Sequence, residues 1–252
     1  MQSRLLRILV LATSVATLAA ACGGGGNDRP SLESQPSSSS PSTTVPSYVS
    51  FIAQPTAATV KVHEAPDEAS PAHEYPNPWL LDENPDHTVP QVFLVQDRQP
   101  GWVQVLLPVR PNGTTGWIRE SDVRLTPNRF RILIERGAHQ ITVYDGDKVM
   151  IQEPVAVGTD ETPTPTGKYY LRVLLKAPNP NTVYGPYAYG LSGHSEVLTT
   201  FNGGDGELGI HGNNDASVLG KSVTHGCVRI SNESITRLAG LLPLGTPVEI
   251  AA

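Results

Sequence analysis

Cysteine and positive charge are both scarce in this sequence. Its 252 residues contain two cysteines, Cys22 and Cys227, and 18 Lys and Arg against 24 Asp and Glu, for a formal net charge of −6. Two thiols exclude a disulfide-rich scaffold. The sequence also lacks the basic patch that would indicate nucleic acid as a partner. Only 6% of the residues are aromatic, whereas glycine and proline number 23 each. This composition is typical of a soluble, loop-rich protein built mainly from β-strands.

Long hydrophobic runs are also missing, apart from a short one near the start. Arg4 and Arg7 precede the apolar segment 8–21, which is too short to span a bilayer and is typical of an export signal. The Leu-Ala-Ala-Ala-Cys sequence that ends at Cys22 resembles a bacterial lipobox. We therefore predict a lipoprotein signal peptide over residues 1–21 and a lipid on Cys22. The alternative is an ordinary secretory signal cut near Ala21, which would leave a free thiol.

The stretch after Cys22 has almost no apolar side chains to bury, which predicts a disordered tether over residues 22–49. The lipid and the tether together predict a membrane-anchored lipoprotein on the extracytoplasmic side, facing the cell wall. Such a protein meets an oxidising compartment, where cysteines are normally paired or absent. An unpaired Cys227 therefore indicates either a reactive thiol or an inert buried one.

Short strands separated by turns predict a β module over residues 50–127. The segments 101–107 and 116–123 both open with Gly-Trp and flank a turn-rich stretch, and together they resemble a bacterial SH3-like module, which is a small β-barrel. Residues 63–90 show no strand pattern. We interpret the histidines in that stretch as solvated loop residues and not as metal ligands, because their spacing fits no known ligand set: His63, His73 and His87.

The strand and turn pattern is clearer in the second predicted domain, residues 128–252. Residues 131–135 and 141–144 alternate in polarity, Asp145-Gly146 signals a hairpin, and residues 148–158 form the returning strand. One helix is expected, capped by Ser231 or Asn232 and stopped by Pro243, with an apolar stripe made of Ile235, Leu238, Ala239 and Leu242. We predict a mainly β domain with one main helix against a sheet.

Two histidines lie near Cys227 in the sequence, and both suit a nucleophilic cysteine. His211 ends a strand-like segment, and His225 precedes Cys227 by two residues. A neighbouring imidazole and a helix N-terminus both favour the thiolate, which is the attacking form. Gly226 permits a sharp turn that points the N–H groups of Gly226 and Cys227 toward one place, as in an oxyanion hole. These groups suffice for acyl transfer without a metal or a cofactor.

Residues 209–232 contain His-Gly, a spacer with Gly-Lys, and Thr-His-Gly-Cys followed by an Arg and an Asn. This signature resembles that of the YkuD-type L,D-transpeptidase catalytic domain. The hairpin that begins at residue 131 and the Thr-Pro-Thr-Gly turn of residues 164–167 are similar to the same family. The resemblance covers roughly residues 130–250 and implies a β-sandwich-like fold with the cysteine in a cleft under a flap.

The resemblance also implies roles for individual residues. Cys227 would be the nucleophile and His211 its general base, oriented by the backbone carbonyl of Gly212. Gly226 and Cys227 would form the oxyanion hole, with the N–H of His225 as a further candidate donor. We interpret the His225 side chain as an orienting or packing group rather than as the base.

Substrate binding is assigned to four residues. Residues 181–196 correspond to the family's flap, where Tyr187 and Tyr189 alternate and would wall a groove for a peptide stem, although ordinary strand aromatics give the same pattern. Arg229 either has a structural role or meets a substrate carboxylate, and Asn232 shapes the turn. His194 is interpreted as a surface loop histidine.

The resemblance implies a peptidoglycan L,D-transpeptidase. Cys227 would attack the bond after the third residue of a tetrapeptide stem, release D-alanine, and pass the acyl group to an amine of another stem, giving a 3→3 cross-link. Carbapenem-type β-lactams would acylate the same sulfur. The alternatives are an L,D-carboxypeptidase with water as the acceptor and a non-catalytic wall-binding lipoprotein. A zinc peptidase that uses His211, His225 and Cys227 is a further alternative, but the spacing of these residues matches no known zinc-ligand motif.

Overall fold

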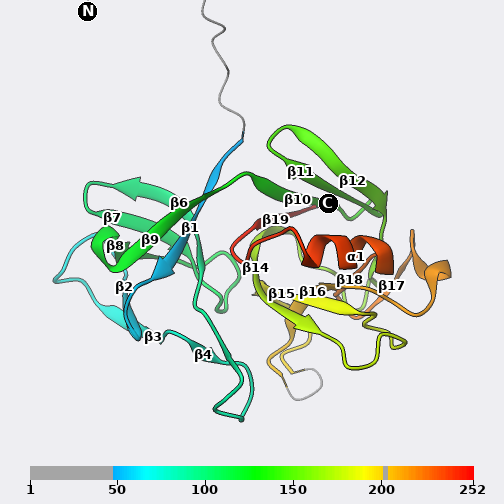
Figure 1. The fold of residues 1–252 in the computed structure, drawn as a ribbon, viewed down its shortest axis with the longest axis horizontal. Coiled ribbons are helices and arrows are strands. Elements are labelled where there is room, and N and C mark those ends of the chain that lie inside the picture. The colour runs from blue at the N-terminus through cyan, green and yellow to red at the C-terminus, as the bar shows by residue number, and fades with distance from the viewer. Residues whose placement is uncertain (1–47, 201–203) are drawn as a thin grey trace, which may run out of the picture. The chain divides into compact units, whose positions relative to one another are not determined.

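The structure is a computed structural model that describes residues 48–200 and 204–252 (Figure 1). These residues form a mainly β protein with one α-helix, which confirms the predicted fold class. The predicted signal peptide, the lipidated Cys22 and nearly all of the tether lie outside the described residues. No helix in the described part of the chain has both the length and the apolarity needed to cross a membrane.

The N-terminal sheet is antiparallel throughout. Its strands are β1 (Ser50–Pro55), β2 (Thr59–His63), β3 (Ala72–Pro76), β6 (Phe93–Gln99), β7 (Trp102–Leu106), β8 (Thr115–Arg119) and β9 (Val123–Asn128). They are ordered β3-β2-β8-β7-β6-β1-β9, and the short η1 (Glu120–Asp122) precedes β9. Alternate residues such as Val60, Val62, Val103 and Val105 point into a buried cluster, as a period of two requires. The SH3-like assignment of this module stays a prediction.

Our expectation that residues 63–90 lack strands is wrong. They include β3 and a small hairpin of β4 (Trp79–Leu80) with β5 (Thr88–Val89). The expectation of three solvated histidines is also wrong for His63, which is 7% exposed and meets the Trp102 ring edge-on at a centroid distance of 5.1 Å. His73 and His87 are exposed, as expected.

The second sheet begins directly after the first, because β9 ends at Asn128 and the next strand starts at Phe130. Its strands are β10 (Phe130–Glu135), β11 (Gln140–Asp145), β12 (Lys148–Pro154), β14 (Gly167–Lys176), β15 (Tyr187–His194), β16 (Glu207–His211), β18 (Val228–Arg229) and β19 (Pro247–Ala251). They are ordered β12-β11-β10-β19-β14-β15-β16-β18, and the β10–β19 and β16–β18 pairs are parallel. A separate parallel pair joins β13 (Val157–Gly158) to β17 (Ser222–Thr224), and η2 (Ala216–Val218) precedes β17.

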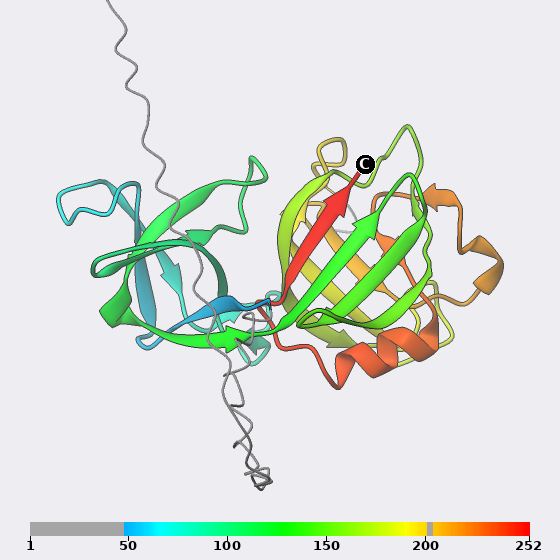
Figure 2. The ribbon, with the colours of Figure 1, turned by 90° about the horizontal axis from the view of Figure 1, so that it is seen from above.

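The second sheet curls strongly, with the helix α1 (Asn232–Ala239) beside it (Figure 2). The helix begins after Ser231, whose hydroxyl accepts a hydrogen bond from the Ser234 N–H, so Ser231 is the predicted cap. Ile235 and Leu238 are buried in the domain core, where each contributes about 1.5–3 kcal/mol of hydrophobic stabilisation. Because α1 packs against β15 and β16, it supports the strand that ends at His211.

Candidate active site

The parallel pairing of β16 with β18 brings together the two residues predicted to do chemistry. Ile210 lies opposite Val228, so Cys227 enters β18 beside Gly209. A Cβ on Gly209 would lie 3.8 Å from the sulfur, in ordinary contact. His211 closes β16 and lines the same pocket as Cys227. The register of one strand pair therefore places the thiol and the imidazole in a common pocket.

This pocket has a volume of about 320 Å³. Cys227 is partly exposed in it, whereas His211 is only 4% exposed. Tyr184, in the connection before β15, lies against the imidazole with ring centroids 4.9 Å apart and an interplanar angle of 54°. An incoming substrate thus reaches the sulfur from solvent, while the imidazole is shielded. Tyr184 was missed in the sequence, although it lies in the stretch that corresponds to the flap.

Hydrogen bonding determines which nitrogen of His211 accepts a proton. Nδ1 lies 2.7 Å from the carbonyl oxygen of Gly212, so it donates, and Nε2 is the basic nitrogen. Burial lowers the pKa of His211 to about 4, and the positive charge of Arg229 acts in the same direction, against hydrogen bonds to the backbone of Gly212 and Val183. The imidazole is therefore uncharged at neutral pH and able to act as a base.

The thiol of Cys227 is also uncharged at rest. Burial raises its pKa, and a hydrogen bond with the backbone of Gly209 and the charge of Arg229 only partly oppose this. This differs from our expectation of a thiolate, because desolvation outweighs the groups that favour the anion. The pocket therefore holds an uncharged thiol and an uncharged imidazole.

Two threonines that sequence reasoning missed hold the turn around Cys227. Thr164 Oγ1 donates to the Gly226 carbonyl at 2.8 Å and accepts from the Gly158 N–H at 2.9 Å. Thr224 Oγ1 donates to the Cys227 carbonyl at 2.6 Å and accepts from the Gly226 N–H at 3.2 Å. Gly226 has a φ of +112°, which a side chain would strain. The Thr-Pro-Thr-Gly turn was the one sequence signal that pointed to Thr164.

Of the predicted oxyanion donors, His225 and Cys227 line the pocket, whereas Gly226 lies between them in the chain and its N–H is already bonded to Thr224. The Gly226 N–H would have to leave Thr224 before it could bind an oxyanion, so the role assigned to Gly226 and Cys227 stays a prediction. His225 is exposed and lines the pocket. Arg229 also lines it, and among the described residues its buried Nε has no hydrogen-bond partner. This donor favours a role in binding an anionic group.

Asn232 does not line the pocket and instead fastens the turn after His211. Its Oδ1 accepts a hydrogen bond from the Asn213 N–H at 2.9 Å. A Cβ on either Gly212 or Gly185 would collide with that same oxygen. Asn232 therefore holds the peptide between Gly212 and Asn213, whose carbonyl binds His211 Nδ1, which explains its position in the motif better than substrate contact does.

Neither tyrosine predicted to bind substrate lies in the pocket. Tyr189 is 1% exposed, and its hydroxyl donates to the carbonyl oxygens of Leu238 and Leu242 at 3.0 and 3.1 Å. It anchors the end of the helix to the sheet. Tyr187 is half-buried and packs on the edge of the domain core. The alternation of the two residues was a strand pattern, which was the alternative reading.

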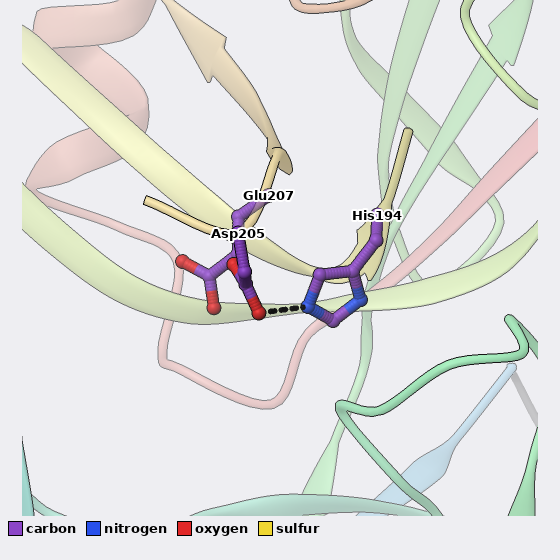
Figure 3. A group of neighbouring side chains, drawn as sticks. All are labelled: His194, Asp205 and Glu207. Carbon is purple, nitrogen blue, oxygen red and sulfur yellow. Dashed lines mark hydrogen bonds and ion pairs between the residues drawn. The ribbon is translucent and has the colours of Figure 1, made fainter. Parts of the chain in front are cut away.

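The interpretation of His194 as a surface residue is wrong, since it is 3% exposed at the end of β15. Its Nε2 lies 3.0 Å from Asp205 Oδ2, and Glu207 is the third member of this group (Figure 3). Within the described residues this is the one set of His, Cys, Asp and Glu ligand atoms lying within 4.8 Å of one another. The His211, His225 and Cys227 set considered for a zinc peptidase is not such a group.

Residues 129–250 match the family model of the L,D-transpeptidase catalytic domain, YkuD. A stretch of 121 residues is 34% identical to Bacillus subtilis YkuD, which carries the name of an L,D-transpeptidase, and covers 48% of this chain and 65% of that protein. A stretch of 124 residues is 30% identical to Bacillus subtilis YqjB, named in the same way, and covers 47% of this chain and 69% of that protein. The structure of L,D-transpeptidase 3 from Mycobacterium tuberculosis with a faropenem-derived adduct aligns at a TM-score of 0.42 and 15% identity, over 64% of this chain and 91% of that one.

A cysteine and a neutral histidine in one pocket of a curled sheet define an acyl-transfer site of the cysteine-dependent kind. With the sequence matches, this chain belongs to the L,D-transpeptidase family, and its YkuD-type catalytic domain spans residues 129–250. The family resemblance noted in the sequence is thereby confirmed. The chain matches 65% of the length of YkuD, so what the whole protein acts on is a separate question.

Proposed function

We propose that this protein is a peptidoglycan L,D-transpeptidase that forms 3→3 cross-links through an acyl group on Cys227. The observation that carries the proposal is the shared pocket of Cys227 and His211, with His211 Nδ1 bound to the Gly212 carbonyl and Nε2 left basic. Membership of the family supports the reaction class, and the place of the partly exposed Cys227 in the pocket lining supports an acyl donor that enters this pocket.

In the first half-reaction the Cys227 sulfur attacks the carbonyl carbon of the third residue of a tetrapeptide stem, and its proton passes to His211 Nε2. The C–N bond to the terminal D-alanine then breaks, and His211 returns the proton to the leaving amine. In the second half-reaction an amine of another stem attacks the thioester and gives a proton to Nε2. The sulfur leaves and takes that proton back, which restores the neutral pair.

The remaining pocket residues have supporting roles in this proposal. Backbone N–H groups of Gly226, Cys227 and His225 are the candidate donors to the tetrahedral oxyanion, and losing one such donor typically costs about 2.7–4 kcal/mol of transition-state stabilisation. Arg229 lines the pocket, and its positive charge favours contact with a stem carboxylate.

Exchange of Cys227 for alanine tests the nucleophile. We expect Cys227→Ala to lose covalent adduct formation with a carbapenem-type β-lactam, which would otherwise acylate the sulfur, and to lose turnover of a disaccharide tetrapeptide. Mass spectrometry of the intact protein reads the first result, and product masses read the second. Adduct formation that survives in Cys227→Ala would overturn the assignment.

The same assay separates the proposed activity from its alternatives. A cross-linked dimer supports the transpeptidase, tripeptide alone indicates an L,D-carboxypeptidase with water as the acceptor, and no turnover by a folded protein indicates a wall-binding role. Metal chelators should leave the wild type active, in contrast to a zinc peptidase.

We also propose that the protein works outside the cytoplasmic membrane, anchored by a lipid on Cys22. The basic start, the short apolar segment and the lipobox-like sequence support this placement. Loss of membrane association in a Cys22→Ala variant, judged by fractionation of cells, is the expected result. A Cys22→Ala protein that still sediments with membranes would contradict the anchor.

A further inference from the structure

The connection between β7 and β8 of the N-terminal sheet reaches the segment that follows β15. Arg110 lies in this connection, and its Nη2 is within hydrogen-bonding distance of three backbone carbonyl oxygens. The distances are 3.1 Å to Ser195, 3.3 Å to Leu198 and 2.7 Å to Asp205. A single cationic nitrogen thus joins both described arms of the segment, which are far apart from Arg110 in sequence.

Asn112, two residues further along the same connection, binds the neighbouring backbone. Its Nδ2 donates to the His194 carbonyl at 2.8 Å, and its Oδ1 accepts from the His194 N–H at 2.9 Å. The side-chain amide therefore satisfies both backbone groups of one residue, as a paired strand would do. Asn112 thus holds the backbone of the last residue of β15, directly before the segment that lines the pocket.

The segment held in this way forms one wall of the Cys227 pocket. Ser195, Leu198 and Gly206 all line that pocket. The Ser195 N–H donates to the Gly206 carbonyl at 2.8 Å, and a Cβ on Gly206 would collide with the Leu198 carbonyl. The two arms are therefore tightly packed against each other. A displacement of the carbonyls that Arg110 binds would move side chains that line the pocket.

The group in Figure 3 adds contacts from within the catalytic domain to the structural tie between the N-terminal sheet and the pocket wall. His194 Nε2 bonds to Asp205, while Glu207 forms an ion pair with Arg172, so each carboxylate already has a partner. Arg172 in turn stacks on Trp79 of the N-terminal part, with its Cζ 3.9 Å from the ring centroid. A metal ion would have to displace these partners. We therefore interpret the group as part of the same structural tie.

We propose that Arg110 and Asn112 are positioning residues for the reaction, which hold the wall formed by residues 194–198 and 205–206 in register with Cys227. The N-terminal module then sets how well a peptide stem is bound and leaves the reactivity of the thiol unchanged. The kinetic part of this proposal rests on the proposed transpeptidase function, whereas the ordering of the wall does not.

Kinetics and hydrogen exchange on the full chain test the proposal together. Arg110→Ala should raise KM for the tetrapeptide donor about fivefold to tenfold with kcat within about twofold, because the wall loses charge-assisted hydrogen bonds but touches no reacting atom. Asn112→Ser should act in the same direction. Arg110→Lys should restore part of the loss, since one nitrogen makes all three contacts and an ammonium has three donors.

Arg124→Ala is the matched control. Arg124 lies in the same sheet and binds Gln54 Oε1 at 2.9 and 3.2 Å, with no side-chain hydrogen bond to residues 130–200 or 204–252 of the second domain. The Arg124→Ala variant should therefore have the wild-type KM for the tetrapeptide donor. Alkylation of Cys227 by iodoacetamide should proceed at the wild-type rate in every variant, because this small reagent reacts with the sulfur without binding to the pocket wall.

Amide hydrogen exchange separates the outcomes. Faster exchange in peptides that cover residues 194–198 and 205–208 of Arg110→Ala, with unchanged exchange in residues 130–154, supports the proposal. Unchanged exchange in the wall would overturn it whatever the activity, and so would a KM equal to that of Arg124→Ala in an active enzyme. A wild type that is alkylated but turns over no stem would instead refute the proposed function, while the exchange data still decide whether Arg110 orders the wall.

Discussion

Burial keeps both His211 and Cys227 uncharged, and this decides how the sulfur is activated. A thiolate–imidazolium pair needs solvation or strong counter-charges, whereas this pocket desolvates both groups and places the cation of Arg229 near them. The charge of Arg229 lowers the pKa of both groups, but burial is the larger cause in each, so it keeps the thiol protonated and the imidazole neutral. In the proposed mechanism attack and proton transfer therefore occur together, with His211 held in one tautomer by the Gly212 carbonyl.

The pH dependence of acylation follows from the lowered pKa of His211. Only the neutral imidazole accepts the thiol proton, so the rate of carbapenem acylation should rise with pH through a midpoint near about 4 and be flat from roughly pH 5.5 to 8. Mass spectrometry of the adduct over this range measures it. A midpoint near the ordinary histidine value of about 6.5 would contradict the neutral pair.

The same lowered pKa requires a control for unfolding in acid. The unfolded chain has an ordinary histidine and binds more protons than the folded chain between about pH 6.5 and 4, so His211 makes the fold less stable as pH falls through that window. Circular dichroism at each pH would show whether the loss of rate precedes unfolding. If the two coincide, the midpoint reports stability and the neutral pair loses its support.

At the scale of elements, the Thr-Pro-Thr-Gly turn of residues 164–167 fixes the position of the backbone around Cys227. Thr164 is fully buried and links Gly158 to Gly226 through its hydroxyl. Thr164→Val keeps the shape but leaves a buried N–H and a buried carbonyl without partners. We expect a loss of about 2–4 kcal/mol in the free energy of unfolding and slower acylation of Cys227. Urea titration and adduct kinetics measure the two effects.

Thr164→Ser is the matched control for that prediction, because it keeps the hydroxyl and removes only a methyl group. It should retain most of the stability and the acylation rate. If Thr164→Val is as stable and as reactive as Thr164→Ser, the hydrogen bonds of the Thr164 hydroxyl do not hold the turn and the prediction is wrong.

Local sequence patterns were enough to predict several strands and the helix. They did not predict which side chains of these elements are buried by other parts of the chain. The hairpin of β11 and β12 and the helix α1 follow from periodicity and turn residues, and the Cys227 motif follows from its spacing. The burial of Tyr189 depends on carbonyls of the helix end some fifty residues later, and that of His194 on Asn112, some eighty residues earlier. The raised pKa of Cys227 likewise arises from tertiary burial, which the motif does not encode.

At the scale of the whole described chain, a small apolar cluster joins the two sheets. Ile52, Leu94 and Leu106 of the N-terminal sheet are buried together with Tyr170 of β14. This contact gives the β7–β8 connection a fixed base from which Arg110 and Asn112 reach the pocket wall. The two sheets therefore act as one unit in the proposed positioning of the wall.

Tyr170 offers a test of that union, because its ring is fully buried while its hydroxyl has no hydrogen-bond partner among the described residues. Tyr170→Phe keeps the ring and removes the unpaired hydroxyl, so the free energy of unfolding should rise by about 1 kcal/mol. Tyr170→Ala should lower it by about 3–5 kcal/mol through the cavity left between the sheets, and should raise KM as Arg110→Ala does. Urea unfolding of the full chain measures both. A Tyr170→Phe variant less stable than the wild type would show that the hydroxyl is satisfied by solvent and that the cluster is wetter than its burial indicates.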